Sequence, residues 1–274
     1  MTSSVAIIMR AMNEMPYTRS ALDMLKQQTV SNFDIFAVDS GSTDGTLETL
    51  QAHSVSLQQI RPEDYVPGKV LNEAIARTHH EIIVLLNADA IPQSTDWLEK
   101  LIQPIINDET DATFSKQIPR SDAHFIVSYD YERAYNPGEI APEFFSAVSC
   151  AFKRAIWEAH NFPNHDYAED TIWASACLIY GARFQFVPES EVEHSHNYTR
   201  QQLFDKKYRH GYALGTTQGK TSPLSHRLYL CGRELLRDFI YACKKKQFRI
   251  IPNNIAYRII IHTGFHAGIR NAAK

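Results

Sequence analysis

Acidic side chains follow two apolar segments that have the length of buried strands. Residues 82–86 lead into Asn87-Ala88-Asp89, and residues 33–38 lead into Asp39. Two central strands that each carry a carboxylate at the C-terminal end are typical of an open α/β sheet, which binds ligands at that edge. Carboxylates suit a hard divalent cation such as Mg²⁺ or Mn²⁺, and such a cation suits phosphates. The pattern predicts an enzyme that handles nucleotides.

Asp39 is the first candidate for a ligand contact. A carboxylate at the end of the second strand can accept a hydrogen bond from the ring N3–H of uracil or thymine. The alternative is a turn residue for the loop Ser40-Gly41-Ser42-Thr43. Asp44, which precedes Gly45-Thr46, is instead expected to cap the next helix.

Asp89 is the candidate metal ligand. One of its carboxylate oxygens can hold Mg²⁺ or Mn²⁺ against a diphosphate, and the ion then stabilises the charge of a departing diphosphate. An Asn-x-Asp sequence by itself also occurs in ordinary loops, so this motif needs support from the other residues.

Glu169 and Asp170 are adjacent acids at the expected start of a helix. Acids at this position also interact favourably with the helix dipole, so a structural role competes with a functional one. In the functional interpretation one acid removes a proton from an attacking hydroxyl group, and the other anchors an acceptor or the loop.

His194 and His196 are two residues apart in a segment that the pattern predicts to be a strand. Residues at this spacing face the same side of a strand, so both imidazoles are expected to line one cleft, with one as a metal ligand. The alternative is a pair of hydrogen-bonded surface residues.

Alternating strands and helices must position these side chains, and the alternation predicts a largely parallel, doubly wound α/β sheet. We expect strands at 5–9, 33–38, 55–60, 82–86, 112–118, 144–152, 183–187 and 191–196. We expect helices at 17–28, 44–53, 70–78, 98–106 and 166–180. From residue 200 the chain becomes helical and basic, so we expect a catalytic domain at 1–199 and a helical extension at 200–274. Neither a Gly-x-Gly-x-x-Gly fingerprint nor a Gly-Lys-Ser/Thr loop is found.

The composition is that of an ordinary soluble protein, with 44% apolar and 22% charged residues among 274. Four scattered cysteines are expected to be reduced thiols of a cytosolic protein. The chain enters a strand within a few residues, so no signal peptide is expected, and no apolar run of about 18 residues predicts a membrane span. These features favour a cytoplasmic location.

The net charge of −3 hides an asymmetry between the two ends of the chain. Residues 220–274 contain eleven Lys or Arg and two acids, a net +9, which leaves −12 for residues 1–219. Apolar residues of this tail surround Lys244-Lys245-Lys246. Either two helices pack on the catalytic domain, or basic and apolar residues contact the inner face of an anionic membrane. No motif supports nucleic-acid binding.

Taken together, the motifs resemble the nucleotide-diphospho-sugar glycosyltransferases of family 2, which have the GT-A fold. The resemblance covers roughly residues 5–196, and the order and spacing of its motifs make it specific. Its motifs are Asn13-Glu14, the segment from Val38 to Thr46, Gly68-Lys69-x-x-Asn72, Asn87-Ala88-Asp89, Glu169-Asp170 and Pro188-Glu189 before His194. The run His194-Ser195-His196-Asn197-Tyr198 is similar to bacterial rhamnosyltransferases of this family.

The resemblance implies a role for each candidate residue. Asp170 would be the catalytic base beside Glu169, Asp89 would bind the metal, and His194 would reach the metal or the diphosphate. Lys69 would help to neutralise the diphosphate. The nucleotide-sugar site would consist of Arg10, Asn13, Glu14, Asp39 and Gly41.

The resemblance has two departures. Asn87 replaces the first Asp of the metal motif, which leaves fewer charged ligands. The Gln-x-x-Arg-Trp signature of processive synthases is missing, which favours addition of a single sugar. We therefore expect an inverting, metal-dependent, non-processive glycosyltransferase that uses a UDP- or dTDP-sugar and a glycan or lipid-linked acceptor in bacterial surface-polysaccharide synthesis. The acceptor is expected at the loop-rich residues 122–143.

Two other classes of protein remain as alternatives. A non-catalytic scaffold of a glycan-assembly complex is one, although the presence of Asp89, Asp170 and His194 together argues against it. A sugar nucleotidyltransferase is the other, but it should carry a glycine-rich loop after the first strand, and residues 8–13 contain no glycine.

Overall fold

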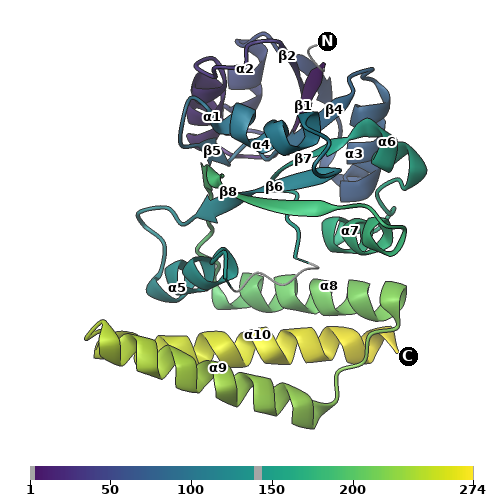
Figure 1. The fold of residues 1–274 in the computed structure, drawn as a ribbon. Helices are drawn as coiled ribbons and strands as arrows, with labels where there is room; N and C mark the ends of the chain where they lie inside the picture. The colour runs from purple at the N-terminus through teal and green to yellow at the C-terminus, as the bar shows by residue number, and fades with distance from the viewer. Residues whose placement is uncertain (1–3, 139–143, 274) are drawn as a thin grey trace. The chain divides into compact units, whose positions relative to one another are not determined.

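The computed structural model describes residues 4–138 and 144–273 (Figure 1). In this part of the chain, eight strands form one sheet in the order β3-β2-β1-β4-β7-β6-β8-β5. The strands are β1 (Val5–Ala11), β2 (Phe33–Asp39), β3 (Ser56–Gln59), β4 (Ile82–Leu86), β5 (Ile91–Pro92), β6 (Ala112–Ile118), β7 (Ser149–Lys153) and β8 (Phe184–Glu193). The helices that connect them are α1 (Tyr17–Leu25), α2 (Thr46–Gln51), η1 (Pro62–Asp64), α3 (Pro67–Ala76), α4 (Trp97–Ile106), α5 (Phe125–Ala134), α6 (Arg154–Ala159) and α7 (Glu169–Ile179).

The first half of the sheet is parallel and covered on both faces, as the alternation of strands and helices predicts. Strands β3, β2, β1 and β4 all pair in parallel. All five residues of β4 are buried, and neighbouring residues contribute to opposite layers. Val84 packs in the layer that contains Leu22 and Trp97, whereas Ile83 packs in the layer that contains Leu71 and Trp173. Because both layers are apolar, every residue of β4 is apolar.

The second half of the sheet is mixed. Strand β7 lies between β4 and β6 and is antiparallel to both, β6 pairs in parallel with β8, and β8 is antiparallel to β5. The strand expected at 144–152 begins at Ser149, and the helix expected at 166–180 begins at Glu169. The expected strands at 183–187 and 191–196 are one strand, β8, whose pairing with β6 shifts register between Ser115 and Lys116.

The expectation that His194 and His196 lie within a strand is therefore wrong. Strand β8 ends at Glu193, and both histidines follow it. The alternation of side chains along a strand cannot set their directions, because that rule holds only while the strand continues.

The strand directions bring several chain segments to one edge of the sheet. Strands β1, β2, β4, β6 and β8 share one direction, because β7 is antiparallel to both of its neighbours. Their C-terminal ends, and the beginning of β7, therefore lie along the same edge. This edge is where an α/β sheet of this kind binds ligands.

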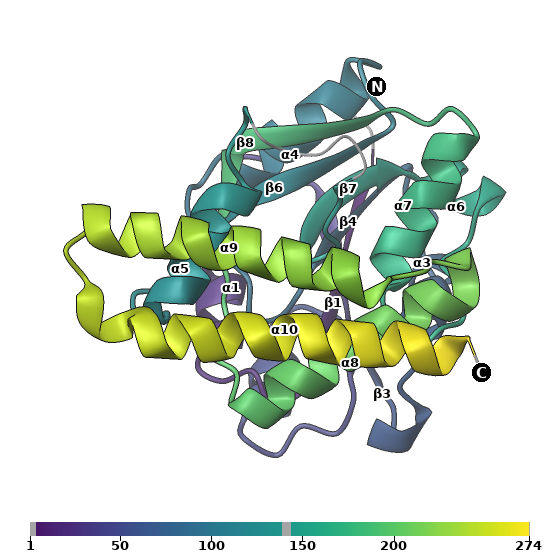
Figure 2. The same cartoon turned by 90° about the horizontal axis from the view of Figure 1, so that it is seen from below.

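The chain divides into two compact units. The first contains residues 1–121, 131–165 and 169–195, and the second contains residues 122–130, 166–168 and 196–274. The long helices of the second unit are α8 (Arg200–Gln218), α9 (Leu224–Lys244) and α10 (Ile251–Ala272), with η2 (Phe248–Ile250) before α10 (Figure 2). Helix α8 begins with a capping box, in which the side chains of Thr199 and Gln202 each accept a hydrogen bond from the other residue's backbone N–H.

Helices α8 and α10 approach closely through glycines. A Cβ atom at Gly211 would lie 2.3 Å from the carbonyl oxygen of Phe265, and one at Gly268 would lie 2.1 Å from that of Tyr208. Because no side chain fits these gaps, glycine is required on both helices.

Within the described residues, every helix is too short or too polar to cross a lipid bilayer.

Candidate active site

Asp39 lies at the end of β2 with one carboxylate oxygen held and the other unpaired. Its side chain is buried, and Oδ1 accepts hydrogen bonds from the backbone N–H groups of Gly41 and Ser42, both at 3.0 Å. Oδ2 is also buried but has no partner among the described residues. A buried acceptor without a partner is costly, so its presence points to a ligand that donates a hydrogen bond.

Asn13 and Glu14 join the loop after β1 to the loop after β2. Asn13 adopts a left-handed backbone (φ 57°), and its Oδ1 accepts a hydrogen bond from the N–H of Thr43 at 2.8 Å. The N–H of Glu14 donates to Oγ1 of Thr46 at 2.9 Å. Burial and the neighbouring charge of Asp89 raise the pKa of the Glu14 carboxyl to about 8.

Asp44 does not take the helix-capping position that its sequence context suggests. The N-cap of α2 is Gly45, and the Asp44 carboxylate instead accepts hydrogen bonds from the N–H groups of Met15 and Thr46. Asp44 thus adds to the connection between the two loops.

Arg10 holds Glu169 and Asn87 at the same edge. Its Nη1 donates to Oε1 of Glu169 at 2.8 Å, and its Nη2 donates to Oδ1 of Asn87 at 3.3 Å. The charge of Glu169 is therefore paired within the protein. Asn87, which replaces the first Asp of the metal motif, uses its amide oxygen for Arg10.

Asp170 differs from Glu169 because its described hydrogen bonds come from neutral groups. Its carboxylate accepts from the N–H of Thr171 at 2.7 Å and from the N–H of Ala147, just before β7, at 3.4 Å. Burial and the adjacent charge of Glu169 raise the pKa of Asp170 to about 6. A carboxylate with this pKa is ionised at neutral pH and is a stronger base than an ordinary aspartate.

Asp89 lies between a buried arginine and a histidine. Its Oδ2 is 3.0 Å from Nη2 of Arg120 and 3.4 Å from Nε2 of His194. The Arg120 guanidinium also donates to the backbone carbonyls of Asp89 and Ser195, and it lies 3.6 Å from the centre of the Tyr17 ring. These contacts fix both the carboxylate and the arginine in place.

Gln117 orients the ring of His194 through Nδ1, the ring nitrogen that does not face Asp89. Nδ1 lies 2.9 Å from Oε1 of Gln117, and the Gln117 amide nitrogen in turn donates to Oγ of Ser146 at 2.8 Å. An amide oxygen can only accept, so Nδ1 carries the proton and donates it to Gln117. In the neutral ring this leaves a lone pair on Nε2, directed toward the Asp89 carboxylate.

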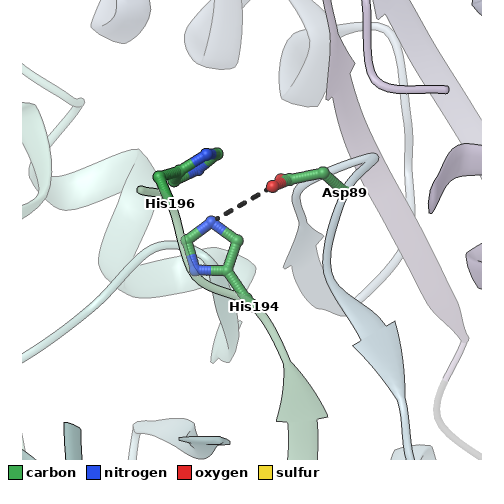
Figure 3. Close-up of side chains that lie close together, drawn as sticks. All are labelled: Asp89, His194 and His196. Carbon is green, nitrogen blue, oxygen red and sulfur yellow. Dashed lines mark ion pairs between the residues drawn. The ribbon is translucent and has the colours of Figure 1, made fainter. Parts of the chain in front are cut away.

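Asp89 and His194 form a donor pair that fits a divalent cation. A carboxylate oxygen and a ring nitrogen that face each other repel unless a proton or a metal lies between them. Two ligands at right angles on an octahedral ion, each about 2.1 Å from it, lie about 3 Å apart, which is close to the separation in this pair. Figure 3 draws Asp89 and His194 with the ion pair between them.

Two residues of the Gly68-Lys69-x-x-Asn72 motif hold the segment that precedes α7. A Cβ atom at Gly68 would lie 1.9 Å from the carbonyl oxygen of Pro163, so only glycine fits there. The Asn72 amide donates to the carbonyl of Phe162 at 2.8 Å and accepts from the N–H of Phe162 and from the indole of Trp157. Lys69 is exposed, and its Nζ lies 3.8 Å from Oε1 of Glu73.

Neither Arg120 nor Gln117 belongs to a motif that is recognisable in the sequence. Gln117 is in β6 and Arg120 follows that strand, which ends at the same edge as β4. Polar residues at the end of β6 were therefore a usable signal, once the direction of this strand is known. Of the region suspected for the acceptor, residues 125–134 form α5, and residues 139–143 lie outside the described residues.

The chain matches one family model and is similar to several known proteins. The model of the family described as "Glycosyl transferase family 2" matches residues 6–161. The O-antigen chain rhamnosyltransferase RfbN of Salmonella typhimurium is 27% identical over 205 residues, which cover 69% of this chain and 65% of that protein. The O-antigen chain rhamnosyltransferase WbaN of Salmonella anatum is 27% identical over 200 residues, which cover 67% of this chain and 63% of that protein. The chain thus spans slightly less than two thirds of the length of these curated relatives.

Solved structures confirm the fold. The mannosyltransferase PcManGT from Pyrobaculum calidifontis, in complex with GDP-Man and Mn²⁺, superposes with a TM-score of 0.67 at 20% identity, over 98% of this chain and 86% of that one. The glucosyl-3-phosphoglycerate synthase from Mycobacterium tuberculosis, in complex with Mn²⁺, UDP and phosphoglyceric acid, gives 0.58 at 18% identity over 78% of both chains. The expected GT-A fold is confirmed.

Proposed function

Because the chain belongs to glycosyl transferase family 2, we propose that it moves one sugar from a nucleotide-diphosphate donor to an acceptor hydroxyl group, with inversion at the anomeric carbon. The observation that carries this proposal is the position of three carboxyl groups, in three different environments, at one edge of the sheet. Asp39 has a buried unpaired oxygen, Asp89 lies 3.4 Å from Nε2 of His194, and Asp170 has a raised pKa.

Asp39 is the proposed contact to the base. Its unpaired Oδ2 can accept a hydrogen bond from the ring N3–H of uracil or thymine, while Oδ1 keeps the loop in shape. This favours a UDP- or dTDP-sugar as donor. The proposed nucleotide-sugar site is completed by Arg10, Asn13, Glu14 and Gly41. The last three shape the loops beside Asp39, and Arg10 forms the ion pair with Glu169.

Asp89 and His194 are the proposed metal ligands. When bound there, the ion stabilises the negative charge of the departing diphosphate. A pair of one oxygen and one nitrogen donor favours Mn²⁺ over Mg²⁺, since Mg²⁺ binds oxygen ligands almost exclusively. Lys69 remains a predicted contact to the diphosphate.

Asp170 is the proposed catalytic base. Its carboxylate takes the proton of the acceptor hydroxyl as the hydroxyl oxygen forms a bond to the anomeric carbon. The bond from that carbon to the diphosphate oxygen breaks at the same time, and its electron pair leaves with the nucleoside diphosphate. A single displacement from the opposite face inverts the configuration. Glu169, which is paired with Arg10, is proposed to position Asp170 and the start of α7.

The acceptor is proposed to be a growing surface glycan on a lipid carrier. Two curated relatives are O-antigen chain rhamnosyltransferases, so we further propose that the transferred sugar is rhamnose or a close analogue. A lipid-linked acceptor would place the enzyme at the cytoplasmic face of the membrane.

Donor binding provides the direct test. Thermal shifts are measured with UDP-, dTDP- and GDP-sugars, each with Mn²⁺ and with EDTA. The matching donor should raise the melting temperature, and Asp89→Ala should remove the Mn²⁺-dependent part of the rise while it leaves the effect of the nucleoside alone. Asp39→Asn turns the free acceptor into a donor and should abolish the nucleoside effect.

Two outcomes would contradict the proposed function. Full transfer activity in EDTA would exclude the proposed metal ligands. A protein that binds no nucleotide sugar, with or without Mn²⁺, would favour the scaffold alternative.

A further inference from the structure

Helix α9 carries its acidic residues on the inner side. Asp238 is almost fully buried, and its carboxylate accepts from Nε of Arg258 on α10 at 2.6 Å and from Nη2 at 3.0 Å. Glu234, one turn earlier, lies 3.1 Å from Nε2 of His262. The two acids of the segment 220–274 are therefore directed at α10 and away from solvent.

The outer side of α9 is apolar. Leu228 and Leu236 have 63% and 62% of their surface exposed, which is far above the level of packed side chains. At about 100° per residue, the exposed apolar residues of this helix fall within roughly half of its circumference, so they share one side. They are Leu224, Leu228, Tyr229, Leu236, Phe239 and Ile240. This polarity is the reverse of the usual one for a helix on the surface of a protein in water.

The apolar surface continues onto the neighbouring elements. Phe248 of η2, and Ile255 and Ile259 of α10, are also exposed. A groove between α9 and α10 is lined by Leu224, Leu228 and Ile259, among other residues. We call the exposed apolar residues of α9, η2 and α10 together the apolar face. A contiguous surface of this kind marks an interaction site.

Basic side chains border the apolar face, and acids are missing from it. Arg233, Lys244, Lys245, Lys246 and Arg249 are exposed. Among the described residues from 220 onward, the acids are Glu234 and Asp238. Both pair with residues of α10, Glu234 with His262 and Asp238 with Arg258. The exposed charges that the segment 220–273 presents are therefore all basic.

We propose that the apolar face is a membrane-binding surface, which inserts its apolar side chains at the headgroup level of an anionic lipid bilayer while the surrounding lysines and arginines contact the headgroups. Charge decides between a bilayer and a second copy of the chain. Two copies that met through this face would bring their basic borders together without counter-charge, whereas anionic lipids supply it. This inference deepens the membrane location that accompanies the proposed function, but it does not depend on sugar transfer.

Vesicle flotation with the full chain tests the proposal. The probe is a vesicle of phosphatidylcholine and phosphatidylglycerol, compared with a vesicle of phosphatidylcholine alone. Wild type should float with the anionic vesicles, and its partition coefficient should fall at least about tenfold when the salt concentration is raised. Lys244→Glu with Lys245→Glu and Lys246→Glu should reduce binding to the level of neutral vesicles.

The apolar residues are tested with a matched control. Leu236→Glu with Phe239→Glu should lower partitioning at least about tenfold even at low salt, because it puts charge where side chains must insert. The control is Ile106→Glu with Ile179→Glu, which adds the same charges at two exposed isoleucines of α4 and α7 and should bind like wild type. Since all four positions are exposed, the melting temperatures should stay close to that of wild type.

Two results would overturn the proposal. One is equal flotation of wild type and the Leu236→Glu, Phe239→Glu variant. The other is a wild type that binds neither kind of vesicle and is a dimer by light scattering, while the Leu236→Glu, Phe239→Glu variant is a monomer. That result would assign the apolar face to a second copy of the chain. No sugar donor is present, so failure here leaves the proposed transfer reaction standing.

Discussion

The two units of the chain each bury an arginine among acids, but they complete the pairing to different degrees. In the second unit, Arg258 makes four hydrogen bonds, two with Asp130 and two with Asp238. In the first unit, Arg120 makes one to the Asp89 carboxylate, and its Nε is buried without a partner among the described residues. The arrangement around Arg258 is closed. The arrangement around Arg120 leaves hydrogen-bonding capacity for another group.

The carboxyl groups follow the same division. Burial would raise the pKa of Glu234, but the hydrogen bond with His262 and the charge of Arg258 outweigh it and lower this pKa to about 2. At Asp170, burial and the charge of Glu169 outweigh the hydrogen bonds from Thr171 and Ala147 and the charge of Arg10, so its pKa rises to about 6. An ionised carboxyl group with a lowered pKa stabilises the fold, whereas an ionised carboxyl group with a raised pKa costs stability.

The largest effect is expected at Asp170. Asp170→Asn should reduce the rate of transfer by about 10² to 10⁴-fold, because it removes the base and preserves the shape. The same change should stabilise the protein by about 1–3 kcal/mol at pH 7, since it removes a charge that the fold disfavours. Steady-state kinetics and thermal melting measure the two effects. A variant that is slower but also less stable would contradict the comparison.

The next largest effect is expected on stability, at the closed arrangement around Arg258. Arg258→Met should lower the free energy of unfolding by about 3–5 kcal/mol, because Asp238 is left buried without its partner. Arg249→Met, at an exposed arginine, is the matched control and should change it by less than about 0.5 kcal/mol. Denaturant titration gives both values. If the two variants were equally stable, the Arg258 network would not be structural.

A smaller effect is expected behind the metal ligand. Gln117→Leu removes the acceptor that fixes the His194 ring, and it should weaken Mn²⁺ binding by about 10- to 100-fold without unfolding the protein. Electron paramagnetic resonance of Mn²⁺ measures this affinity without any turnover. Unchanged affinity would show that His194 is oriented by other contacts or does not bind the ion.

The smallest change is the dependence on pH. The rate of transfer should fall by up to about tenfold per unit as the pH decreases below about 6, because Asp170 must be ionised to accept a proton. Stability should behave differently. The penalty from Asp170 disappears between about pH 6 and 4, whereas the contribution of Glu234 is kept above about pH 4.5 and is lost only toward pH 2. Rates from pH 4 to 8 follow Asp170, and melting temperatures of wild type and Asp170→Asn over the same range separate its contribution from that of Glu14, whose pKa is also raised.

The fold was predictable from the sequence because its strands are short apolar runs between amphipathic helices. The errors occurred where polar residues interrupt a strand. Pro188, Glu189 and Ser190 look like a turn, but β8 runs through them because its ladder with β6 shifts register at that point. Such a shift depends on a partner about 75 positions away in the sequence, which local patterns do not contain.

The site was predictable where it consists of residues that directly follow strands. Asp39 and Asp89 belong to this group. Arg120 and Gln117 escaped notice because their importance depends on the direction of β6 and on a partner beyond residue 190. Gly68 and Asn72 were found through their motif, but their contacts with residues 157–163 show that they support the chain next to α7, and only three-dimensional packing reveals this.

The division into units has a consequence for how such a protein can be inherited. The chain passes from one unit to the other five times, and residues 122–130 and 166–168 of the second unit are encoded within the stretch that carries the catalytic candidates. Recombination at a single breakpoint near residue 200 would therefore import Arg258 and Asp238 without Asp130, the acid that completes their network. An exchange of the C-terminal helices at this point should therefore lower stability unless residue 130 is exchanged with them.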